Sequence, residues 1–197
     1  FILHTLTTHE TLLHNINSPV SNKASLEDDL DIMLSLEPSL STSSVGPGKR
    51  KELFQENFGN LGIVIGGGEI HSANTCDVGT VPSGIGERGR DKTSLGEIDK
   101  VLNDKEGGYN EIVVDNPKIF GMFKSVDMAK DGSIVVNKSD SINVFKSHID
   151  LAHKKGIPQF ILTPDRRMFE YISVDESGKI QIGKEINPED VAKSNAG

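Results

Sequence analysis

Short gaps between apolar runs are the feature that most constrains the fold of this chain. Residues 111–114 and 119–125 are separated only by a turn around Pro117, and residues 158–162 and 168–174 are separated by a similar gap. Connections this short join antiparallel strands, because a parallel pair needs a crossover of about a dozen residues or more. We therefore predict an α+β fold with a mostly antiparallel sheet and packed helices, in place of a doubly wound parallel sheet.

Capping residues and helical spacing predict helices between these strands. Ser94 and Glu97 form a capping box ahead of an apolar stripe. A second helix is predicted over residues 141–155, where apolar side chains recur at helical spacing until Gly156. Shorter apolar runs predict three further strands, over residues 61–65, 133–137 and 180–182.

The N-terminal part of the chain differs in composition from the rest. Residues 1–36 contain two amphipathic segments, the clearer of which begins at Ser25, and they predict a helical N-terminal appendage. Residues 37–50 are rich in Ser, Thr, Pro and Gly without periodicity, as is typical of a flexible linker. The α+β domain is then expected over residues 51–184, followed by a polar tail over residues 185–197.

Charge and cysteine content narrow the classes of partner and compartment. The formal net charge of −8 repels phosphate backbones and argues against nonspecific nucleic-acid binding. No run approaches the roughly 20 apolar residues of a membrane span. The single cysteine, Cys76, cannot form an internal disulfide, which favours a reducing, cytosolic environment. Because the chain starts at Phe1 without an initiator Met, we expect a fragment or a processed form.

Two segments predict an anion-binding site. Gly66-Gly67-Gly68 follows an apolar strand, and glycine lets bare backbone amides approach a phosphate. Arg88, Arg90 and Lys92 lie in a glycine-containing loop before the helix that Ser94 caps, where guanidinium groups suit a phosphate or pyrophosphate. The alternatives are a tight turn at the glycines and a solvated loop of mixed charge at the basic residues.

Glu111 is the candidate catalytic acid or base. It stands at the start of an apolar strand, close to Tyr109, whose ring can stack on a ligand. The alternative is an ordinary exposed glutamate at a strand end.

Cys76 is a second candidate, as a nucleophile with His148 or His153 as its base. The alternative is an inert small hydrophobe and a packed or surface helix histidine. Cys76 also lies near further residues of metal-ligating type, which are Glu69, His71 and Asp77. Their spacing matches no standard zinc pattern, so we predict no metal site.

The strand pair around Glu111 resembles that of a known enzyme family. The run Glu111-Ile112-Val113-Val114, the turn Asn116-Pro117-Lys118 and the run Ile119-Phe120-Gly121-Met122-Phe123 are similar to the catalytic-glutamate strand pair of ADP-ribosyltransferases. The resemblance implies NAD binding, with Glu111 holding the nicotinamide ribose. Tyr109 stands where toxin members often have another Glu.

Residues 109–171 are also similar in style to modules of secreted effectors of intracellular bacteria. That resemblance implies secretion into a host cell and transfer of nucleotide-derived groups to host proteins. The leading hypothesis is therefore an effector-type domain that binds ATP or NAD and transfers part of it to a protein, with Glu111 at its centre. The alternatives are a noncatalytic protein-interaction module, in which residues 1–36 bind a partner, and a hydrolase that depends on Cys76.

Overall fold

The computed structural model describes residues 2–5, 39–45, 61–74, 98, 100 and 111–193. Most of these residues form strands, which are β1 (Ile2–Thr5), β2 (Ser39–Ser44), β3 (Leu61–Asn74), β4 (Glu111–Ser125), β5 (Asp127–Met128), β6 (Ile134–Val135), β7 (Gln159–Leu162), β8 (Met168–Val174) and β9 (Ile180–Ile186). Two helices are described in full, α5 (Ile142–Lys154) and α6 (Pro188–Lys193), and Ile98 and Lys100 are also helical.

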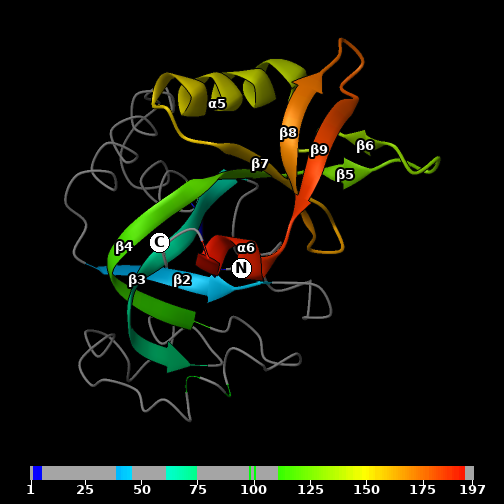
Figure 1. Ribbon diagram of the computed structural model, residues 1–197. Coiled ribbons are helices and arrows are strands. Elements are labelled where there is room, and N and C mark those ends of the chain that lie inside the picture. Colours follow the sequence, from blue (N-terminus) through cyan, green and yellow to red (C-terminus); the bar gives the residue numbers. More distant parts are fainter. Residues whose placement is uncertain are drawn as a thin grey trace, which may run out of the picture.

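Seven of the described strands form one sheet in the order β2-β1-β3-β4-β7-β8-β9, while β5 and β6 form a separate pair. Strand β2 also pairs with β4, so β1, β2, β4 and β3 close into a ring. The β4–β7 pair is parallel, and the other pairs of this sheet are antiparallel. Helix α5 lies in the connection between β4 and β7 and sits beside β7 and β8 (Figure 1).

Strands β3 and β4 bend together, which is what closes the ring (Figure 1). Their pairing is interrupted by several register shifts between Val64 and Ser72. Gly68 has a φ of 121°, and a Cβ there would lie 2.7 Å from Cγ1 of Val114. On the facing strand Asn116 also has a positive φ, of 49°. Glycine tolerates such backbone geometry, and bulges bend a strand, so this glycine run is used to turn β3.

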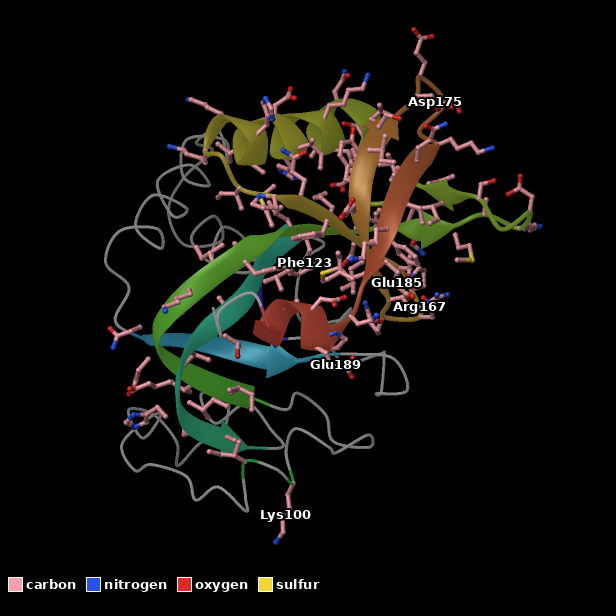
Figure 2. The ribbon with its side chains drawn as sticks, viewed as in Figure 1. Lys100, Phe123, Arg167, Asp175, Glu185 and Glu189 are labelled. Carbon is pink, nitrogen blue, oxygen red and sulfur yellow. The ribbon has the colours of Figure 1, made fainter. Side chains whose placement is uncertain are left out.

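Buried side chains gather in three clusters around the sheet. The first lies among β3, β4 and α5 and includes Leu61, Ile63, Ile112, Met122 and Leu151. The second joins β4, β7 and α6 through Phe123, Phe160, Leu162 and Val191 (Phe123 is labelled in Figure 2). The third lies under α5 and includes Val126, Phe145, Ile149, Ile161 and Ile180.

Gly121 of β4 is expected to tolerate no larger residue. The rings of Phe120 and Phe160 stack with centroids 5.2 Å apart, and a Cβ on Gly121 would lie 2.2 Å from Cε2 of Phe160. We predict that Gly121→Ala lowers the free energy of unfolding by about 1–3 kcal/mol, as overpacking usually does, when measured by urea denaturation. The control is Gly183→Ala, because its Cβ would meet the flexible Glu170 side chain at 3.2 Å. Equal stability of the two variants would contradict the prediction.

The predicted fold class is wrong in its helical content and in its N-terminal appendage. Ile2–Thr5 is strand β1, and Ser39–Ser44, inside the segment expected to be a linker, is strand β2. Both strands are held by long-range pairing rather than by a local pattern. Thr42 of β2 is fully buried, and its hydroxyl donates a hydrogen bond to the carbonyl oxygen of Ile112. The helices predicted within residues 1–36 lie outside the described residues.

The turn predicted around Pro117 is also wrong, because β4 runs through it as one bent strand. Further along the chain, the predicted helix over residues 141–155 and the predicted strand pair over residues 158–162 and 168–174 are confirmed. Strands β7 and β8 pair antiparallel, and α5 begins after Ser141, whose hydroxyl accepts a hydrogen bond from the Val144 amide at 3.0 Å. The last predicted strand is β9, which extends beyond the expected residues to Ile186.

Candidate functional site

Half of the predicted site residues lie outside the described part of the chain, namely Cys76, Arg88, Arg90, Lys92 and Tyr109. Glu111 is described as the first residue of β4, where its backbone is paired with Ser43 of β2 and with Asn74 of β3. It therefore begins a strand that has neighbours on both sides, rather than an edge strand.

The glycines Gly66, Gly67 and Gly68 lie within β3, and Gly67 is paired with Lys118 of β4. The strand continues to Asn74, so these glycines do not open a helix as they do in a phosphate-binding loop. The bend of β3 accounts for the glycine run, and phosphate binding there stays a prediction.

A pair of polar side chains joins β3 and β4. Nδ1 of His71, on β3, lies 2.9 Å from Oδ2 of Asp115, on β4. The two side chains are 20% and 26% exposed, respectively, so this His–Asp pair is largely buried.

The other ring nitrogen of His71, Nε2, is buried and takes no hydrogen bond from the described residues. A carboxylate at Nδ1 favours the tautomer with the proton on that nitrogen, which leaves a lone pair on Nε2. The register shift between Ile70 and Ser72 sets His71 out of the regular ladder, as bulges do when they redirect a side chain. With that tautomer, Nε2 is a hydrogen-bond acceptor.

A second cluster of polar side chains lies at the other end of β4. The Nζ atom of the fully buried Lys124 donates a hydrogen bond to Oδ2 of Asp140 at 2.8 Å and lies 2.9 Å from Nδ1 of His148. Burial lowers the pKa of Lys124, although Asp140 opposes the shift. Burial and the nearby Lys124 lower the pKa of His148 to about 4. His148 is therefore neutral at pH 7, with Nδ1 as the acceptor for Lys124.

The structure places the predicted residues Glu111 and His148 at opposite ends of β4, because His148 contacts Lys124 near the C-terminal end. Lys124 and Asp140 were not predicted as site residues from the sequence, and neither was the pairing of His71 with Asp115. A lysine within the apolar run Ile119–Ser125 was the one available sign of the buried cluster.

No protein-family model matches the chain, and no curated protein or solved structure matches it. The resemblances to ADP-ribosyltransferases and secreted effectors therefore stay predictions. Within the described ranges, no three His, Cys, Asp or Glu side chains gather as metal ligands. In the same part of the chain, no helix is long and apolar enough to cross a membrane.

Proposed function

We propose that the chain is a nucleotide-dependent group-transfer domain, with an acid–base site at the His71–Asp115 pair between β3 and β4. The observation that carries the proposal is the His71–Asp115 pair, in which Nδ1 is held at 2.9 Å and Nε2 is left without a hydrogen bond from the described residues. A buried polar atom without a partner calls for an explanation. A substrate hydroxyl or amine that displaces the groups covering Nε2 and donates to it would provide one.

His71 would act as the general base, taking a proton from the attacking group of the acceptor protein at Nε2. Asp115 would hold the ring and stabilise the imidazolium that forms, as the acid does in a Ser-His-Asp triad. A histidine in this role contributes a rate factor of about 10²–10⁴.

Glu111 is the first residue of β4, four positions before Asp115. That separation is about 13 Å along an extended strand, so a ligand lying along β4 can contact both residues. In this proposal Glu111 holds the ribose of ATP or NAD, as the ADP-ribosyltransferase resemblance implies. The phosphates would be bound by Arg88, Arg90 and Lys92, as predicted from the sequence.

The test incubates the protein with ATP or NAD and a host-cell protein extract as acceptor. Turnover is measured as release of the leaving group. We predict that His71→Asn and Glu111→Gln each lower the rate by about 10²–10⁴-fold. The matched control is His153→Asn, a substitution of an exposed histidine on α5 that should leave the rate unchanged. Unchanged thermal unfolding of each variant would show that the loss is not a loss of fold.

Other outcomes would overturn the proposal. If neither nucleotide is turned over, and neither at millimolar concentration raises the melting temperature, the chain is better described as an interaction module. Bound ligand should add about 2.7 kcal/mol at 100-fold above its Kd, so the absence of a shift is informative. If Cys76→Ser alone abolishes an activity that His71→Asn leaves intact, the domain is a cysteine-dependent hydrolase.

A further inference from the structure

The Lys124–Asp140–His148 cluster joins three segments that are distant in the chain. Lys124 comes from β4, Asp140 from the segment before α5, and His148 from α5 itself. The contacts of Nζ of Lys124 with Asp140 and His148 are each shorter than 3.0 Å, and the Lys124 side chain is fully buried. The cluster therefore fastens α5, together with the segment before it, to the end of β4.

We propose that this cluster is an acid-operated latch, which holds α5 against β4 at neutral pH and releases it when His148 takes up a proton. Protonation of Nδ1 removes the acceptor for Lys124 and places a second positive charge about 3 Å from the first (2.9 Å between the nitrogens). Asp140 is one carboxylate facing two cations, so it cannot neutralise both. Release of α5 would expose the third apolar cluster, which joins Phe145 and Ile149 of the helix to residues beneath it.

The groups around His148 offer little stabilisation to a protonated imidazole ring. Lys124 disfavours the charged ring and Asp140 favours it, and burial disfavours it most. The neighbouring strands β7 and β9 contribute the apolar Ile161 and Ile180 to the cluster under α5. From β8 comes Tyr171, which packs against Phe145 and whose pKa is raised, mainly by burial and further by Asp150.

The size of the effect follows from the two states of His148. Its pKa is about 4 with the latch closed, against the ordinary value of 6.5 once the ring is in water. The open state binds the proton more tightly, so closing becomes less favourable as the pH falls from about 6.5 towards 4. Between pH 7 and pH 5 these values raise the population of the open state about 20-fold.

Hydrogen exchange of the full chain at pH 7 and pH 5 tests the proposal, with rates corrected for intrinsic exchange. We expect the protection of α5 amides to fall about 20-fold at pH 5 relative to amides of β3 and β4. His148→Asn keeps an acceptor near the position of Nδ1 but cannot titrate, so its α5 protection should change less than about 2-fold over this range. His153→Asn, on the exposed side of the same helix, should behave like the wild type.

Two results would overturn the latch. One is an equal loss of protection across α5, β3 and β4, which indicates global unfolding rather than release of a helix. The other is an NMR titration of the His148 ring in the wild-type protein with a midpoint near 6.5, since a closed latch requires a midpoint near 4. That titration needs no variant, so it decides the question even if His148→Asn does not fold. Neither result bears on His71 or Glu111, because their role is tested separately by nucleotide turnover.

Discussion

A chain that lacks residues 1–46 is expected to lose cooperative folding. The deletion removes β1 and β2, and with them two sides of the ring formed with β3 and β4. It also removes Val45, which is buried in the second hydrophobic cluster, and Thr42, which is fully buried against Ile112. Without β1 and β2, the first halves of β3 and β4 would expose core side chains, and their backbone groups would be left unpaired. We expect circular dichroism in urea to show a broad, low-amplitude transition in place of a sharp one.

A single substitution tests the same pairing without shortening the chain. Ser43 of β2 is paired with Leu3 on one side and Glu111 on the other. Proline there cannot donate to the sheet, so Ser43→Pro should cost about 1–3 kcal/mol, the usual penalty for leaving a buried polar group without its hydrogen bond. The matched control is Glu176→Pro, at the second position of a turn in which the Gly178 amide bonds to the Asp175 carbonyl, where proline is favoured. If the truncated chain and Ser43→Pro both unfold like the wild type, β1 and β2 do not belong to the cooperative unit.

The C-terminal half of the fold could be predicted because its signals are local. Ser141 caps α5 through a hydrogen bond to the amide of Val144, three residues along the chain. Gly156 ends the helix with a φ of 69°, a conformation that glycine adopts without strain. The connection between β7 and β8 is short enough to require an antiparallel pair, and this is what forms.

The N-terminal half could not be predicted, because its strands depend on partners far away in the sequence. Leu3 pairs with Ser43 and Val64, and neither partner can be inferred from the residues around Leu3. The turn expected around Pro117 was a misinterpretation of a real irregularity. Asn116 has a positive φ, but the facing strand bends at Gly68 in step with it, so β4 bends without reversing.

The candidate site shows the same division. The sequence identified Glu111 and His148 as candidates, since each stands out at its own position. The partners were not identifiable, because His71 is 44 residues from Asp115 and Lys124 is 24 residues from His148. Only the bend of β3 and β4, and the return of α5 to β4, bring these groups together.

Lys124→Met is expected to lower the free energy of unfolding by about 3–5 kcal/mol, the usual cost of removing one partner of a buried ion pair. The side chain of Asp140 is only 7% exposed, so its carboxylate would be left largely desolvated and without the Lys124 ammonium group. Methionine has a similar length and no charge, and it should pack against Phe145, whose ring centroid lies 5.8 Å from Nζ of Lys124. The measurement is urea denaturation at pH 7, where His148 is neutral in the folded protein.

The double variant Lys124→Met/Asp140→Val separates the loss of the pair from the loss of the lysine. Burial lowers the pKa of Lys124 more than Asp140 raises it, so the desolvation of the ammonium group outweighs its attraction to the carboxylate. Replacing both partners by apolar side chains should therefore cost much less than the single change, and a pair of this kind can even be replaced with a gain in stability. If the double variant is less stable than Lys124→Met, the pair does not act as a unit, and Asp140 instead stabilises the start of α5 through other contacts. If Lys124→Met itself costs under about 1 kcal/mol, as an exposed pair would, the cluster is open to solvent and its burial is overturned.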